Sequence, residues 1–137
     1  MYTPPSLRVS NAYRSVAATS SVDGASAHRL IELLFDGLLQ SLAAARGAME
    51  RNEIATKGLQ IQRAVRFIDE GLKGGLDDAR GGELASRLRS LYDYCVDRLT
   101  TANLKNDALA VAEVAALISP LAQGWKEIGR TVAGQPT

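Results

Sequence analysis

The sequence predicts an all-α protein, an antiparallel four-helix bundle that follows a mobile N-terminal arm with room for a short helix. In four successive segments, apolar residues recur at steps of three and four, which is the spacing of one helix face. Glycine, asparagine and aspartate residues separate these segments by short connections. No segment shows the alternation typical of a strand, and helices joined by short loops favour an up-and-down bundle.

The first helix is expected to start with Ser26 as its N-cap and to end near residues 50–52. Its apolar residues cover about half of the helix circumference, as expected for a helix that contacts two neighbours and the arm. These residues are Leu30, Ile31, Leu34, Phe35, Leu38, Leu42, Ala45 and Met49. The second helix is expected from about Ile54 to Leu72, where a group of glycines ends it, and Phe67 lies well off its apolar stripe.

The third helix is expected from Gly82 to Asn103. Its narrow apolar stripe consists of Leu84, Leu88, Leu91, Cys95, Leu99 and Ala102. Tyr92 and Tyr94 are predicted on opposite shoulders of this stripe, where they either pack at a helix edge with wet hydroxyls or contact a partner. Cys95, the only cysteine, is expected to be a small buried hydrophobic residue.

The fourth helix is expected from Asp107, its N-cap, to about Ile128. Its apolar side carries valine, isoleucine and leucine residues followed by Trp125. Pro120 removes one helical amide and strains the preceding turn, so a kink or a break is expected between residues 116 and 120.

The two ends of the chain differ in composition from the predicted bundle. Residues 1–24 are expected to form a flexible arm, residues 25–130 the bundle and residues 131–137 a disordered tail. Within the arm, three apolar residues are spaced by four and three, enough for a short turn that docks on an apolar partner. They are Val9, Tyr13 and Val16.

The composition is that of an ordinary protein with one core. The chain has 137 residues, 46% of them hydrophobic and 23% charged, which fits a single domain. Sixteen basic and fifteen acidic residues leave a net charge of +1, so no overall field attracts nucleic acid or an acidic membrane. Without a signal-like N-terminus or a long apolar run, the chain is expected to be cytoplasmic and not inserted in a membrane.

No motif of an enzyme is present in the sequence. His28 is the only histidine, and a surface position in the first turn of its helix is expected for it. The glycines between residues 71 and 82 lie between two helices and not after a strand, so they indicate capping and not a phosphate loop. We therefore expect no catalysis, no cofactor, no metal ion and no small-molecule substrate.

Several apolar side chains lie beside the core stripes and are candidates for a protein-binding groove. On the bundle these are Leu39, Phe67, Tyr92, Val96 and Leu117, with Tyr94 near them. Either the loops and the arm cover them, or they receive the apolar face of a partner helix. The small residues around them would let a foreign helix approach closely, although alanine also simply favours helix.

The chain resembles the FliS family over roughly residues 11–129. The matching pieces, in family order, are Ala12-Tyr13 with Val16, His28 to Gly37, Gly81 to Ala85, Leu91 to Tyr94, Arg98-Leu99, Ala102 to Leu104, Asn106-Asp107, Glu113-Val114 and Trp125 to Ile128. No single piece is decisive, but their order and spacing together are specific. The family is a helical bundle with a mobile N-terminal arm, which agrees with the periodicity.

The resemblance implies a cytosolic chaperone that binds the C-terminal segment of flagellin, blocks its premature polymerisation and delivers it to the export apparatus. It also implies docking on the cytosolic domain of the flagellar export gate. A client segment of this kind is disordered when alone and exposes the apolar stripes used in the filament. The arm, with Val9, Tyr13 and Val16, is then expected to cover part of the client groove. The alternative is a structural bundle that forms a homodimer through its shoulders and has no client.

Overall fold

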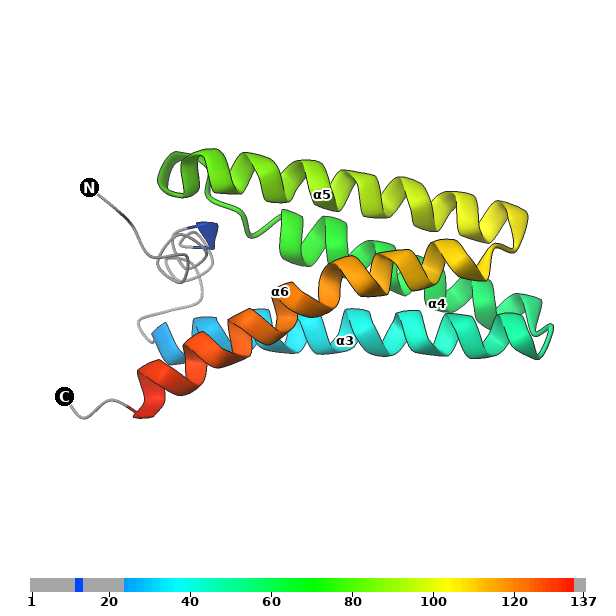
Figure 1. The fold of residues 1–137 in the computed structure, drawn as a ribbon, viewed down its shortest axis with the longest axis horizontal. Helices are drawn as coiled ribbons and strands as arrows, with labels where there is room; N and C mark the ends of the chain where they lie inside the picture. The colour runs from blue at the N-terminus through cyan, green and yellow to red at the C-terminus, as the bar shows by residue number, and fades with distance from the viewer. Residues whose placement is uncertain (1–11, 14–23, 135–137) are drawn as a thin grey trace.

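The computed structural model describes residues 12–13 and 24–134 of the chain. These residues form the helices α3 (Gly24–Glu50), α4 (Ile54–Arg66), the π-helical segment η1 (Phe67–Lys73), α5 (Asp78–Lys105) and α6 (Ala108–Gly134). No strand occurs among the described residues. The prediction of an all-α four-helix bundle is therefore confirmed (Figure 1).

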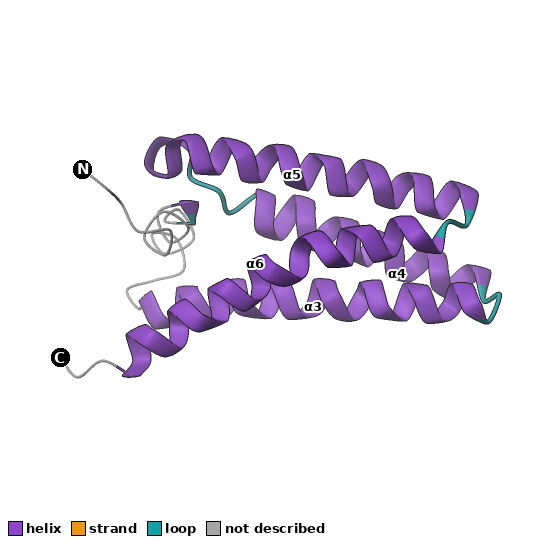
Figure 2. Cartoon of the chain, in the orientation of Figure 1, coloured by secondary structure: helices purple, strands orange, loops and turns teal. Residues whose placement is uncertain are grey.

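The four rods of the bundle pack in a ring. α4 and η1 form one continuous rod, which lies against α3 on one side and α5 on the other. α6 closes the ring by packing against both α5 and α3. Only short loops join successive helices, so each rod runs antiparallel to the next (Figure 2).

One apolar core fills the space inside the ring. All four rods contribute to it, as the helical periodicity requires, and Cys95 is buried within it, as expected. The largest fully buried aliphatic side chains are Ile31, Leu38, Leu42, Ile68, Leu72, Leu99, Val111, Val114 and Ile118.

α5 differs from its expected form in two ways. It begins at Asp78, not at Gly82, because Asp77 caps a first turn by accepting a hydrogen bond from the Arg80 amide at 3.1 Å. Gly82 then has φ 54° and ψ −130°, which produces a kink that a residue with a Cβ adopts only at a cost. The buried stripe is also rotated: Tyr92 lies at its centre with no exposed surface, whereas Leu91 is only half-buried.

The second rod was expected to be α-helical throughout, but only its first part is. From Phe67 it widens into a π-helix, and the Gly74 amide donates to the Asp69 carbonyl five residues earlier at 3.1 Å. A Cβ on Gly74 would lie 2.5 Å from the Glu70 carbonyl oxygen, so the end of this wide turn requires glycine. The Ile54 side chain, expected on the apolar stripe, is exposed near the start of α4.

The ends of α3 and α6 are also informative. α3 starts at Gly24, so Ser26 lies inside the helix and is not its N-cap. Asp107 does cap α6, because its carboxylate accepts hydrogen bonds from the amides of Leu109 and Ala110 at 3.1 and 3.3 Å. α6 then continues through Pro120 to Gly134, so the proline does not break the helix. Pro120 is exposed, where the carbonyl that it leaves unpaired can reach water.

We predict that Leu88→Ala destabilises the fold by about 2–5 kcal/mol, because it opens a cavity in the shared core. Leu91→Ala, at a half-buried position of the same helix, should cost clearly less. Urea unfolding followed by circular dichroism measures both. Equal losses at the two positions would contradict the rotated stripe of α5.

Candidate protein-binding site

The arm reaches the bundle through a pair of tyrosines. Tyr13 is buried, and its hydroxyl hydrogen-bonds the hydroxyl of Tyr92 at the centre of the α5 stripe. Burial raises the pKa of both phenols well above the ordinary value, so both hydroxyls stay protonated at a pH at which an exposed phenol would ionise. Tyr92 was expected on a shoulder with a wet hydroxyl. That expectation is wrong, because its partner comes from a segment 79 residues earlier in the chain.

Trp125 of α6 joins this pair to α3. Its ring meets Tyr13 edge-on at a centroid distance of 5.5 Å and stacks on His28 at 4.3 Å. The indole Nε1 donates a hydrogen bond of 2.9 Å to the backbone oxygen of His28. His28 is therefore partly buried by packing and is not the surface residue that was expected. We call Tyr13, His28, Tyr92 and Trp125 the aromatic cluster.

Gly81 gives the arm its close approach to α5. The Ala12 carbonyl accepts a hydrogen bond of 2.7 Å from the Asp77 amide, which brings the arm backbone against the first turn of α5. A Cβ on Gly81 would lie 2.8 Å from the Ala12 Cα and 2.7 Å from the Ala85 Cβ. Gly81 thus provides space for the arm and Gly82 provides the kink. The sequence showed both glycines, but it did not show this division of roles.

Tyr94 lies on the outside of the bundle, between α5 and α6. Its hydroxyl donates to the Glu113 carboxylate at 2.5 Å, and the Arg98 guanidinium donates to the same carboxylate at 2.7 Å. These hydrogen bonds lower the pKa of Glu113, the one from Tyr94 more than the one from Arg98. The network holds the exposed Tyr94 ring beside α6 as a fixed surface feature.

The outward side of α6 carries very little charge. From Ala108 to Trp125 the only charged residue is Glu113, and the Tyr94 network already engages it. Only a third of the most apolar stretch of α6 is buried, and Leu109 is 81% exposed. Helical spacing puts four apolar residues on this side, which we call the α6 outer face: Leu109, Ala112, Ala116 and Pro120. The exposed, uncharged residues Ser119 and Gln123 lie beside them.

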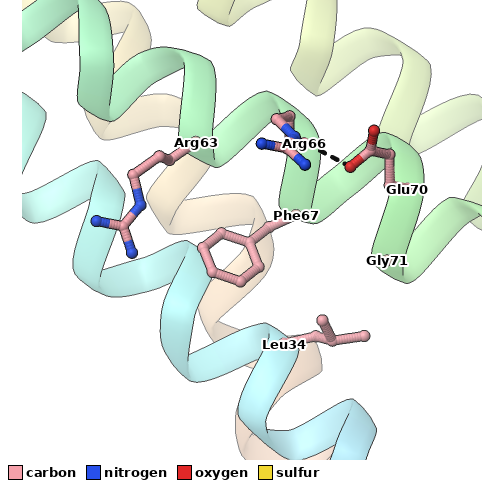
Figure 3. Close-up of a pocket in the computed structure, with 6 residues that line it drawn as sticks. All are labelled: Leu34, Arg63, Arg66, Phe67, Glu70 and Gly71. Atoms are coloured by element: carbon pink, nitrogen blue, oxygen red, sulfur yellow. Dashed lines mark hydrogen bonds and ion pairs between the residues drawn. The ribbon is translucent and has the colours of Figure 1, made fainter.

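A pocket opens on another side of the bundle, where η1 begins. Its volume is about 360 Å³. The lining residues are Leu34 of α3, Arg63 and Arg66 of α4, and Phe67, Glu70 and Gly71 of η1 (Figure 3). Phe67, which the sequence placed off the apolar stripe, thus forms part of a concave surface. We call this cavity the π-turn pocket.

The predicted site residues do not gather in one groove. Tyr13 and Tyr92 lie together in the core, while Val9 and Val16 fall outside the described residues. The remaining bundle residues border different helix pairs. Phe67 contacts α3, and Tyr94 contacts α6. Leu117 follows Glu113 by one turn and so faces α5, as helical spacing requires.

The other two candidates, Val96 and Leu39, lie beside the groove between α5 and η1 and the groove between α3 and α6. Val96 lies on the side of α5 that carries Asp93, whose carboxylate pairs with Lys73 of η1 at 2.5 Å. Leu39 lies on the side of α3 that carries Asp36, which pairs with α6 at 3.4 Å. A partner that contacted all the predicted residues would therefore have to pass over several grooves.

The structure also bears on other classes of function. Among residues 12–13 and 24–134, no three His, Cys, Asp or Glu side chains lie together as they would to hold a metal ion. By length and composition alone, the stretch Ala108–Arg130 of α6 could cross a membrane. A core helix of a soluble bundle has the same composition, so this stretch is no argument for a membrane span.

The fold and its surface define an all-α four-helix bundle with exposed apolar side chains, and comparisons with known proteins identify its family. The family model described as "Flagellar protein FliS" matches residues 9–132. The flagellar secretion chaperone FliS of Salmonella typhimurium is 46% identical over 128 residues, 93% of each chain. FliSB of Pseudomonas aeruginosa, also a flagellar secretion chaperone, is 47% identical over 116 residues, 85% of this chain and 91% of the relative. The chain belongs to the FliS family of flagellar secretion chaperones.

We predict that Tyr92→Phe destabilises the docked arm, because it leaves the buried Tyr13 hydroxyl without a partner, at a cost of about 1–3 kcal/mol. The double variant Tyr13→Phe/Tyr92→Phe removes both hydroxyls and should recover most of this loss. Trp125 is the only tryptophan and contacts Tyr13, so its fluorescence follows the arm while urea unfolding gives the stability. If the losses of stability from the two single variants added up in the double variant, the two hydroxyls would not be partners.

We also predict that the Cys95 thiol is inert in the folded protein. Burial raises the pKa of this thiol to about 11, above its ordinary value of 9.0. The neutral thiol is favoured in the fold, so its contribution to stability is complete below pH 9.0 and is lost as the pH rises toward 11. Thiol labelling at pH 8 should be slow until urea is added. Cys95→Ala should reduce the fall in unfolding free energy between pH 9 and 11. Fast labelling of the native protein would show that the thiol is accessible and not buried.

Proposed function

We propose that this chain binds the C-terminal segment of flagellin in the cytoplasm, prevents its premature polymerisation and delivers it to the flagellar export apparatus. Membership of the FliS family supports the role of a flagellar secretion chaperone. The client itself is our inference. A segment that is disordered alone and becomes helical on assembly presents an apolar face that a second helical surface can mask.

The observation that carries this proposal is the α6 outer face. A helix on the surface of a bundle normally carries charged residues on its solvent side, but α6 has one charge between residues 108 and 125. The alanines at 112 and 116 would let the backbone of a partner helix approach closely. Neighbouring exposed apolar residues are typical of protein interaction sites, and such a surface suits the apolar face of an amphipathic client.

The arm is proposed to act as a displaceable cover. Within the described part of the arm, Ala12 accepts a backbone hydrogen bond from Asp77, and Tyr13 pairs with the Tyr92 hydroxyl and contacts the Trp125 ring. A tethered segment competes at an effective concentration on the order of millimolar, so even weak docking lowers the apparent affinity for a client that extends from the α6 outer face to the aromatic cluster. A client helix that reached the aromatic cluster would have to replace Tyr13.

We predict that Ala116→Asp weakens binding of a C-terminal flagellin segment by at least about tenfold, because it places a carboxylate in an apolar interface. Ala116 is exposed, so the melting temperature should change little. The matched control is Ser90→Asp, an exposed position on α5. Isothermal titration calorimetry measures binding. If the wild-type chain does not bind the flagellin segment and self-associates through the α6 outer face, the homodimer alternative is correct.

We predict that Gly81→Ala loosens the arm and strengthens flagellin binding several-fold, because the added methyl group collides with Ala12 as well as with Ala85 of α5 itself. Gly124→Ala is the control, since a Cβ there meets no atom within 4 Å. Deleting residues 1–17 should act in the same direction as Gly81→Ala. If either change abolishes binding and sharply lowers the melting temperature, the arm is a permanent part of the fold and not a cover.

A further inference from the structure

The π-turn pocket has an apolar floor and a charged rim. Figure 3 shows the Phe67 ring and the Leu34 side chain at the level of α3, with Arg63 and Arg66 projecting from α4. At about 360 Å³ the pocket is large enough for one or two aliphatic or aromatic side chains and too small for a folded element.

Two glycines fix the floor. The Phe67 ring rests on Gly37 of α3, where a Cβ would lie 2.5 Å from the ring, and the Leu34 methyls rest on Gly71, where a Cβ would lie 3.0 Å away. The two apolar side chains are thus interlocked between α3 and η1 and do not collapse into the cavity. Gly71 and Phe67 also belong to the π-helical turn, a feature that is frequent at functional sites.

The two arginines at the rim are not equivalent. Arg66 pairs with Glu70 at 3.0 Å, which balances its charge. Within the described part of the chain, Arg63 has no ion pair or hydrogen bond through its side chain. The rim therefore presents one uncompensated guanidinium, a group that suits bidentate recognition of a carboxylate.

We propose that the π-turn pocket receives an apolar side chain from a partner helix that also carries a carboxylate one helical turn away, which pairs with Arg63. The apolar floor and the volume of the pocket favour an apolar side chain of the partner helix. The uncompensated charge of Arg63 favours an acidic residue three or four positions away on the same helix. This inference rests on the proposed function, because it assigns the pocket to the flagellin segment as one of its contact points.

The test is a binding series with the C-terminal flagellin segment as the probe. Arg63→Gln should weaken binding about fivefold, the effect of one partly exposed ion pair, while Arg63→Lys keeps most of the affinity. Glutamine and arginine have similar helix propensities, so the fold should be retained. Glu70→Gln should act with the opposite sign and strengthen binding about twofold, because it releases Arg66. Arg46→Gln, an exposed arginine on α3 outside the pocket, is the control and should change nothing.

Each outcome has a distinct meaning. If the wild type does not bind the segment, the proposed function fails and the pocket assignment fails with it. If the wild type binds and Arg63→Gln binds equally well, only the pocket assignment fails. An equal loss with Arg63→Gln and Arg46→Gln would show general charge attraction and would also overturn it. Single Asp→Asn or Glu→Gln changes in the segment should reveal one position whose loss is not additive with Arg63→Gln.

Discussion

A buried phenol sets the main constraint on this molecule. Tyr92 lies fully inside an apolar core, where an unpaired hydroxyl would cost about 1–3 kcal/mol. Its partner, Tyr13, comes from the arm, outside the four rods of the bundle. The Trp125 and His28 rings then pack around this pair, and Gly81 leaves room for the backbone that delivers it. The core at this end of the bundle is complete only while the arm is docked.

The outside of the bundle shows the opposite situation, with more apolar surface than the fold requires. α6 contributes its share of the core and still keeps an apolar outer face, and the π-turn pocket keeps two apolar side chains apart. Both features would be unfavourable in an isolated bundle and become favourable when a partner covers them. The interior thus accounts for the fold, and the surplus surface agrees with membership of a chaperone family.

Periodicity and capping chemistry predicted most of the fold. Four apolar stripes predicted four rods, and Asp107 marked the start of α6, because both signals depend only on nearby residues. The central position of Tyr92 could not be predicted in the same way, because it depends on a contact 79 residues away. The Phe67 ring at the start of the π-turn occupies the space that Gly37 leaves in a neighbouring helix, a contact between residues 30 positions apart that local patterns do not show. The candidate site was therefore located only in part, by the off-stripe position of Phe67.

The candidate contacts border all four grooves of the ring, and this placement has a kinetic consequence. A segment that occupies more than one groove is held by several modest contacts in series, so its total affinity is high although each contact is weak. Such a segment can leave one groove at a time, crossing a series of low barriers in place of a single high one. A pull on one end would then peel it off progressively. High affinity and fast release are therefore compatible for a segment bound in this way. A client bound in one deep cavity would have to cross a single high barrier to leave.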